Sequence, residues 1–325
     1  MPSLLKKGKE HTQSSFLVNF WKRKIARAKN ELVRLSKEQA KVELDFKSLG
    51  ITSEVNESTL YLNPLDEGLS AQLYAWKLRE PLNTHFLSKF ILAERGNVDA
   101  VVDIGSNIGY FPLVEIASGA PLVIAIEPVP ETFAYLIKNI SRFENARTLN
   151  VAISDKKEIV KMHIPTKLNL ATILGNTPYL KMAEAPIKEV IDVRSLPLRN
   201  ILVSENLQRK NVIIRMDIEG FEKKIITKLP EEVYGLSFEF HSYILGYDTA
   251  TTMIEKMKKN GYSIQLMTRE LDGLAPIIKV LGINKSLRLY ERLVEKRVYH
   301  EPSLREIKDI LKEQRENPHI FAVRK

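Results

Sequence analysis

Runs of apolar residues alternate with amphipathic stretches along the chain from about residue 96 onward. Short runs rich in Val, Ile and Leu predict strands at 99–104, 121–127, 147–153, 211–216, 235–241, 263–267 and 319–324. Apolar positions at helical spacing predict helices near 109–118, 131–143, 220–229 and 249–260. Strands and helices that alternate in this way favour a parallel sheet covered by helices. A charged segment, 269–316, is predicted to be a helical insertion before the last strand.

The N-terminal arm has a different pattern. Its apolar residues are spaced alternately by three and four, with one polar break at Gln39, and form a heptad pattern: Val18, Trp21, Ile25, Ala28, Leu32, Leu35, Val42 and Phe46. Three interpretations are open: a coiled coil that joins a homo-oligomer, a helix packed on the body of its own chain, or a basic face that contacts nucleic acid or anionic lipid. The predicted organisation is a basic helical arm (1–49), a helical lead-in (50–95) and a Rossmann-like domain (96–325).

Composition and charge narrow the function classes. Residues 1–50 hold twelve Lys/Arg and five Asp/Glu, so this arm carries +7 of the net charge of +9. The chain has no cysteine, which excludes disulfides, thiolate zinc sites and a cysteine nucleophile. Its uncharged stretches are too short to span a bilayer, and the first residues lack the apolar region of a secretory signal. We therefore expect a soluble, cytoplasmic protein without a transmembrane segment.

The stretch "VVDIGSNIGYF" (101–111) joins a predicted strand to a predicted helix through a glycine-rich turn. A dinucleotide fingerprint requires a second glycine where this chain has Asn107, and Asp103 just before Gly105 would repel a pyrophosphate. The next strand ends in Glu127, where a carboxylate can accept both hydroxyls of a ribose. A nucleoside with a cationic tail and no phosphates fits these charges, which favours S-adenosylmethionine.

Five segments, in their order and spacing, resemble the FkbM-type methyltransferase family: "VVDIGSNIGYF", "AIEPVPETFAYLIKNI", "NVAISD", "VIIRMDIEGFE" and "LSFEFHSYI". The resemblance extends from about Arg79 to Met267. It implies a class I methyltransferase Rossmann-like α/β fold with a mostly parallel seven-stranded sheet and an antiparallel last strand. It also implies S-adenosylmethionine-dependent O-methylation, often of sugars or small hydroxylated metabolites. The arm and the segment 269–316 fall outside it.

The resemblance and the charge pattern together predict the cofactor contacts. Gly105 and Gly109 are expected to allow close approach of the methionine part, and Asp103 to reach its ammonium group. Backbone N–H groups from Ser106 to Tyr110 are expected to bind its carboxylate. Glu127 is expected to hold the ribose. The full predicted set is Asp103, Gly105, Ser106, Asn107, Gly109, Tyr110, Glu127, Pro128, Ala152 and Asp217.

Three titratable residues are candidates for catalysis. Asp217 ends the fourth predicted strand, and Glu239 and His241, two positions apart in the fifth, are expected to project from the same face. They could converge on one acceptor hydroxyl, with one of them removing its proton. No metal ligand is assigned, although these three side chains could instead bind a divalent cation. The alternative interpretation is purely structural: Asp217 belongs to an acidic helix N-terminus, and His241 is a histidine at the end of a strand.

Three functions from different classes follow. The first is an O-methyltransferase acting on a sugar, glycan or small metabolite. The second is an RNA methyltransferase that uses the basic arm, favoured by the isoelectric point of about 9.4. The third is a non-catalytic S-adenosylmethionine-binding protein that assembles through the heptad helix. The segments expected to shape the acceptor site, 155–210 and 269–316, carry no pattern that identifies the acceptor.

Overall fold

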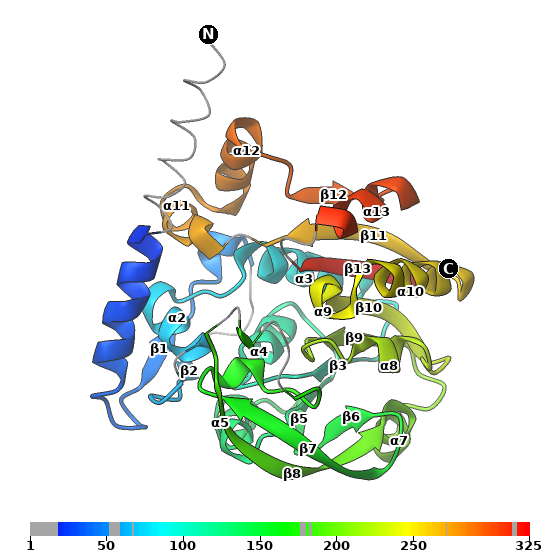
Figure 1. Cartoon of the computed structure of the whole chain (residues 1–325), viewed down its shortest axis with the longest axis horizontal. Coiled ribbons are helices and arrows are strands. Elements are labelled where there is room, and N and C mark those ends of the chain that lie inside the picture. The colour runs from blue at the N-terminus through cyan, green and yellow to red at the C-terminus, as the bar shows by residue number, and fades with distance from the viewer. Residues whose placement is uncertain are drawn as a thin grey trace.

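The structure is a computed structural model, and it describes residues 19–51, 59–66, 68–175, 180–181, 184–270, 272–313 and 317–325. Its centre is an eight-stranded sheet in the order β12-β11-β13-β10-β9-β3-β4-β5 (Figure 1). The strands are β3 (Ala100–Ile104), β4 (Val123–Ile126), β5 (Ala146–Leu149), β9 (Val212–Met216), β10 (Val233–Glu239), β11 (Tyr262–Arg269), β12 (Val298–His300) and β13 (Pro318–Arg324).

The direction of the strands agrees with the expected fold. The strands from β5 through β4, β3 and β9 to β10 run parallel to one another. The last strand, β13, lies antiparallel between β10 and β11. The prediction of a mostly parallel sheet with an antiparallel last strand is therefore confirmed. The predicted number of strands is wrong by one, because β12 forms within the segment predicted to be helical and pairs with the sheet edge at β11.

The inner strands are apolar because both faces of the sheet are covered. Alternate residues of β3 belong to two separate cores: Val101 packs in one, and Val102 and Ile104 in the other. On the face of Val101 lie α3 (Pro81–Glu94), α4 (Tyr110–Ala117) and α5 (Pro130–Ile140). On the opposite face lie α7 (Leu198–Ser204), α8 (Glu222–Ile226), α10 (Tyr247–Lys259) and α13 (Leu304–Glu313). The domain thus has three layers, helices on either side of one sheet.

The stretch between the third and fourth predicted strands builds a small second sheet. It consists of β6 (Ala152–Ser154), β7 (Glu158–Pro165) and β8 (Ile187–Pro197), in the order β6-β8-β7. The single strand predicted at 147–153 is therefore divided, because β5 ends at Leu149 in the main sheet and Ala152 begins the second sheet. Figure 1 shows β7 and β8 below the main sheet.

The remaining elements complete the lead-in and the C-terminal segment. The lead-in contains β2 (Thr59–Tyr61) and α2 (Leu69–Trp76) before α3. The segment predicted as a helical insertion contains α11 (Ala275–Leu281) and α12 (Ile283–Leu293) in addition to β12 and α13. Within the described part of the chain, no helix is both long enough and apolar enough to cross a membrane.

The predicted heptad helix through Phe46 is wrong beyond Leu32. Residues 19–32 are helical, and β1 (Lys41–Glu43) then pairs antiparallel with β2, while Phe46 precedes a 3-10 turn at Lys47–Leu49. Val18 lies outside the described residues. Ala28 and Leu32 are buried in the same core as α2 and α3. The apolar positions of the arm thus pack on the body of their own chain, because the two-stranded β1-β2 ribbon turns the chain back toward it.

This packing predicts unequal effects of truncating two adjacent side chains. Leu32 is 1% exposed and Val33 is 54% exposed. Leu32→Ala should lower the free energy of unfolding by about 2–5 kcal/mol, because it leaves a cavity in the core. Val33→Ala should change it by less than about 0.5 kcal/mol. Urea unfolding at two protein concentrations measures both; a loss in Leu32→Ala that depends on protein concentration would instead indicate a seam between subunits.

Candidate active site

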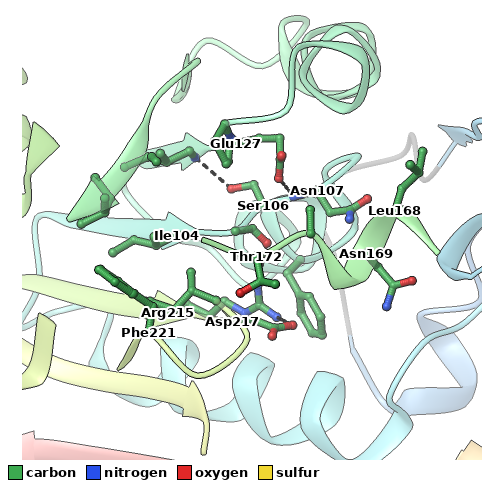
Figure 2. Close-up of a pocket in the computed structure, with 18 of the residues that line it drawn as sticks. Ile104, Ser106, Asn107, Glu127, Leu168, Asn169, Thr172, Arg215, Asp217 and Phe221 are labelled. Carbon is green, nitrogen blue, oxygen red and sulfur yellow. Dashed lines mark hydrogen bonds and ion pairs between the residues drawn. The ribbon is translucent and has the colours of Figure 1, made fainter. Parts of the chain in front are cut away.

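A pocket opens at the carboxyl ends of β3, β4 and β9, where side chains from the glycine-rich turn and from the second sheet face one another (Figure 2). Eight of the ten predicted cofactor residues line it: Gly105, Ser106, Asn107, Tyr110, Glu127, Pro128, Ala152 and Asp217. The two others, Asp103 and Gly109, do not. The position agrees with the rule that ligands of open α/β sheets bind beyond the carboxyl ends of the strands.

The two glycines of the turn are required mainly by the packing of the chain on itself. Gly105 has φ of +84°, and a Cβ there would collide with the backbone oxygen of Asp217. Gly109 has φ of +95°, and a Cβ there would lie 3.0 Å from Leu136 of α5. Gly109 therefore seats α5 against the turn instead of lining the pocket, which corrects the role expected for it.

The backbone N–H groups of the turn are already engaged. The amides of Gly105 and Ser106 donate to Ile126, and that of Gly109 donates to Ser106. The amide of Asn107 donates to the Glu127 carboxylate, and that of Ile108 to the Asn107 side chain. The prediction that the amides from Ser106 to Tyr110 bind a ligand carboxylate would therefore require those of Ser106 to Gly109 to exchange these partners. Arg79 also lines the pocket and was not among the predicted residues.

Glu127 ends the second strand as expected and faces the pocket. One carboxylate oxygen accepts the N–H of Asn107 at 3.0 Å, and the other accepts the N–H of Val129 at 2.9 Å. Each oxygen retains a second lone pair for a ligand hydroxyl. Burial raises the pKa of Glu127 to about 7, an effect that the two amide donors oppose. The group thus changes charge close to neutral pH.

Asp103 is held by an arginine that the sequence analysis did not assign. Arg215, in the middle of β9, is 1% exposed, and its Nη1 lies 3.1 Å from Oδ1 of the fully buried Asp103. Its Nη2 lies 3.3 Å from Oδ2 of Asp217, and its guanidinium carbon lies 4.0 Å from the centre of the Phe111 ring. Asp103 therefore points at Arg215 and does not line the pocket, and its contact with a ligand ammonium group stays a prediction.

A signal for Arg215 was present in the sequence. It is the single charged residue in the otherwise apolar strand "VIIRM". A charge in a buried strand must be paired, because an isolated ion costs several kcal/mol to desolvate. The two aspartates that end β3 and β9 were the available partners.

The three predicted catalytic side chains do lie together. His241 Nε2 is 4.0 Å from Asp217 Oδ1 and 3.8 Å from Glu239 Oε1. Two further carboxylates complete the cluster, with Glu219 Oε2 at 3.4 Å from Nε2 and Glu222 Oε1 at 2.8 Å from Nδ1. His241 does not project from β10 as expected, since the strand ends at Glu239 and the histidine precedes the short helix α9 (Ser242–Leu245). Of the predicted three, Asp217 alone lines the pocket.

The charge states of the side chains in this cluster determine which of them can accept a proton. Burial by itself would lower the pKa of His241, but the carboxylates around it, Glu222 first, raise that pKa well above its usual value. Burial raises the pKa of Glu239 well above its usual value, and the nearby Asp217 adds to the effect. His241 thus keeps its proton at neutral pH and is poorly suited to take another. Asp217, with 22% of its side chain exposed, is the better placed base.

A second group of polar residues lies behind Asp217. Glu80, just before α3, has φ of +40° and binds Arg79 Nη2 at 2.8 Å. His319 of β13 lies directly opposite Glu239 of β10. Burial lowers the pKa of His319 to about 3, so its imidazole is neutral. Neither Glu80 nor His319 was predicted, because His319 meets Glu239 through the pairing of β10 with β13 and Glu80 meets it through the packing of α3 on the sheet.

One wall of the pocket comes from the stretch whose chemistry the sequence did not reveal. Leu168, Asn169 and Thr172 line the pocket between β7 and β8 (Figure 2). The buried Asp66 fixes this wall by accepting the N–H of Leu168, and Thr172 exchanges backbone hydrogen bonds with His163 of β7. The second sheet therefore closes the pocket from the side opposite the glycine-rich turn.

The order of the strands and the pocket at the ends of β3, β4 and β9 define the class I methyltransferase fold. Residues 103–264 match the model of the methyltransferase FkbM domain, so this part of the chain is an FkbM methyltransferase domain. Among proteins with curated functions, none matches the chain significantly.

Several solved structures are similar in fold at low sequence identity. A proposed RNA methyltransferase from Pyrococcus horikoshii is 11% identical, with a TM-score of 0.38 over 75% of this chain and 82% of that one. A proposed S-adenosylmethionine-dependent methyltransferase from Listeria monocytogenes is 10% identical, with a TM-score of 0.36 over 75% and 99%. A further such methyltransferase, from Agrobacterium tumefaciens, is 11% identical, with a TM-score of 0.34 over 82% and 66%.

The ion pairs of Arg215 predict a large loss on truncation. Arg215→Met should lower the free energy of unfolding by about 3–5 kcal/mol, because Asp103 is left buried without its partner. The double variant Arg215→Met/Asp103→Leu should recover part of this loss, since no buried charge remains unpaired. Urea unfolding monitored by circular dichroism measures both variants.

Arg194→Met, at an exposed position of β8, is the control and should have little effect. A double variant no more stable than Arg215→Met alone would contradict the assigned pairing.

Proposed function

We propose that this protein is an S-adenosylmethionine-dependent methyltransferase that methylates a hydroxyl group of a sugar, glycan or small metabolite. The observation that carries the proposal is the carboxylate of Asp217 at the pocket, 3.3 Å from the guanidinium of Arg215 and 4.0 Å from the imidazole of His241. An acidic group held between two cations, at the end of a strand of this fold, is suited to orient an acceptor hydroxyl. When bound, S-adenosylmethionine supplies an electrophilic methyl group on its sulfonium.

The pocket residues fit such a cofactor. The Glu127 carboxylate has lone pairs left for a ribose, and Pro128, Ala152 and Ile153 offer an apolar wall for the base. The inward carboxylate of Asp217 suits an ammonium group, and Arg79 suits a carboxylate. A pyrophosphate fits poorly, since the amides that bind it in dinucleotide sites are engaged within the turn. The donor set therefore supports a ligand with positive charge and without phosphates.

The part of the pocket around Asp217 supports removal of a hydroxyl proton by this carboxylate. Proton transfer requires a base within hydrogen-bond reach of the hydroxyl, and Asp217 is the predicted catalytic residue that lines the pocket. His241, held by Glu222 at 2.8 Å and facing Glu219 at 3.4 Å, is a positioning residue that keeps a positive charge behind Asp217. Positioning of the two substrates supplies much of the remaining rate enhancement.

A second candidate function, methylation of RNA, is supported by the arm. Exposed basic residues follow one side of helix 19–32, namely Lys22, Arg23, Arg27 and Lys29. A basic face of this kind attracts phosphate backbones. The third hypothesis, assembly through a coiled coil, loses its main support because the apolar side of the same helix packs on its own chain.

The cofactor assignment predicts a pH-dependent affinity. Glu127→Ala should weaken binding of S-adenosylmethionine or S-adenosylhomocysteine by about 1–3 kcal/mol, the scale of a hydrogen bond to a charged group. Because the pKa of Glu127 is raised to about 7 and ribose binding favours the ionised carboxylate, wild-type affinity should fall as the pH falls below 7. Isothermal titration between pH 5.5 and 8.5 measures both effects.

Glu144→Ala, at an exposed position, is the matched control and should bind as the wild type does. Unchanged affinity in Glu127→Ala, or tight binding of NAD by the wild type, would contradict the assignment.

The reaction itself is tested with a labelled methyl donor. Label should pass from S-adenosylmethionine to the glycan or metabolite fraction of a cell extract, whereas label in RNA would favour the second candidate. With that acceptor, Asp217→Asn should lower kcat by about 10²–10⁴-fold, the usual contribution of a general base. The KM for the cofactor should change far less if Asp217 acts on the acceptor, and a change confined to KM would place Asp217 at the ammonium group instead.

A further inference from the structure

A row of polar side chains crosses the ends of four strands on the sheet face that α3 covers. His319 of β13 lies opposite Glu239 of β10 on one side and opposite Thr268 of β11 on the other. The parallel register of β9 with β10 continues the row to Asp217, one residue beyond the last paired positions. Directly opposed residues of neighbouring strands present their side chains on the same face. The row therefore runs Asp217, Glu239, His319, Thr268.

Glu80 joins this row from the loop before α3. One carboxylate oxygen of Glu80, one of Glu239 and one ring nitrogen of His319 all lie within 4.8 Å of one another. Ligands of an octahedral cation with bonds of about 2.1 Å are about 3 Å apart when adjacent and about 4.2 Å apart when opposite. The three groups are therefore spaced closely enough to bind one cation after small movements of their side chains.

Two buried polar atoms in the row lack a partner. His319 is 3% exposed and Thr268 is fully buried. Within the described part of the chain, neither Nε2 of His319 nor Oγ1 of Thr268 has a hydrogen-bond partner. Leaving such a group without a partner costs about 1–3 kcal/mol. Buried polar atoms without a protein partner often mark the place of an ordered water or ion. The row thus holds two buried polar atoms without a protein partner among the described residues, and one of them belongs to His319, beside Glu80 and Glu239.

The charges of the surrounding cluster also favour a cation. Among the described residues, five carboxyl groups meet here and face three cationic groups: Glu80, Asp217, Glu219, Glu222 and Glu239 against Arg79, Arg215 and His241. Arg215 is shared further with Asp103. Buried carboxylates in excess must either take up protons or bind a cation, because isolated charge is costly at low dielectric.

Both carboxylates are oriented by amide donors. Nδ2 of Asn317 donates to Glu239 Oε1 at 3.0 Å, and Nδ2 of Asn83 donates to Glu80 Oε2 at 2.9 Å. Outer hydrogen bonds of this kind fix the direction of metal-ligating carboxylates in proteins. The ligand groups thus sit on two strands and a helix start, with their orientation held from behind.

We propose that Glu80, Glu239 and His319 bind a divalent transition-metal cation of the size and ligand preference of Mn²⁺. A neutral imidazole with two carboxylates suits Mn²⁺ or Zn²⁺, whereas Mg²⁺ prefers oxygen ligands alone. The cation lies beside Asp217, the next residue of the row, and there it lowers the pKa of an acceptor hydroxyl. Binding of the cation does not depend on the proposed function. Only its role in the reaction rests on that function.

The test measures binding of the metal alone. Protein treated with EDTA and desalted is titrated with Mn²⁺, and free Mn²⁺ is followed by electron paramagnetic resonance. The wild type should remove one Mn²⁺ per chain from solution, and Zn²⁺ should displace it. His319→Phe, which keeps a ring but no nitrogen, and Glu239→Gln should each weaken binding by at least about tenfold, the lower end of the loss measured for outer-shell partners of metal ligands.

Ser237→Ala is the matched control. Ser237 is fully buried and precedes Glu239 by two residues on the same face of β10, so its loss should leave Mn²⁺ binding unchanged. Circular dichroism establishes whether each variant is folded. If His319→Phe is not folded, Mn²⁺ binding by Glu239→Gln decides whether the cation site exists.

The proposal is overturned if the wild type takes up no Mn²⁺, or if both ligand variants keep wild-type affinity. It is also overturned if binding is lost only in Glu219→Gln, which would move the cation to the neighbouring Asp217, Glu219 and His241 group. Glu127→Ala should still bind Mn²⁺. Binding of S-adenosylhomocysteine without Mn²⁺ uptake would therefore refute the cation site and leave the proposed function intact.

Discussion

The pairing of Arg215 with Asp103 and Asp217 is the interaction on which the rest of the site depends. The guanidinium of Arg215 lies against the ring of Phe111. It joins Asp103, near the end of β3, to Asp217, which directly follows β9. It also accounts for the direction of Asp103, which would otherwise be an uncompensated charge in the core. Asp217 then reaches the pocket as a carboxylate already held from one side. The electrostatics of the pocket thus depend on the buried guanidinium of Arg215.

Around this pair the structure gathers more carboxyl groups than cations, and it separates them by position. On the pocket side, Asp217 and Glu127 line the pocket, each oriented by donors from the protein. Behind Asp217, Glu219 and Glu222 surround His241 and raise its pKa, so that it carries positive charge. Farther along the row, His319 is neutral beside Glu80 and Glu239. His241 and His319, which both lie close to Glu239, therefore differ in charge. Around His241 the carboxylates, Glu222 first, outweigh burial and raise its pKa. Burial lowers the pKa of His319 against the opposing effect of Glu80, and Arg215 and His241 add to the lowering.

The glycine-rich turn differs from a dinucleotide-binding turn in the direction of its amide groups. In a dinucleotide site the amides of such a turn face a pyrophosphate. In this turn Asn107, at φ of +49°, directs its N–H to Glu127, and its side chain accepts the next amide. The turn is therefore closed on itself through these two hydrogen bonds. The wall from the second sheet, with Asn169 and Thr172, then confines the pocket from the other side.

Much of this protein could be predicted from its sequence alone. The periodicity of the strands and helices, the glycine-rich turn and the acidic strand end at Glu127 depend on local pattern, and they predicted the fold class and eight of the residues that line the pocket. The convergence of Asp217, Glu239 and His241 also followed, because residues at the ends of neighbouring parallel strands meet at one sheet edge. Helix 19–32 was predicted from the spacing of its apolar residues, although not the surface on which it packs.

Only the tertiary structure decided which charges meet. Asp103 looked available for a ligand because a sequence does not show that Arg215, 112 residues farther along the chain, lies on the adjacent strand of the sheet. His319 and Glu80 meet Glu239 through the antiparallel pairing of the last strand and the docking of α3, contacts between residues that lie far apart in the chain. The heptad pattern was interrupted at β1 because strand pairing with β2 overrode helical spacing. Local patterns determine elements, whereas pairing of distant charges and strands is decided by the packing of the whole chain.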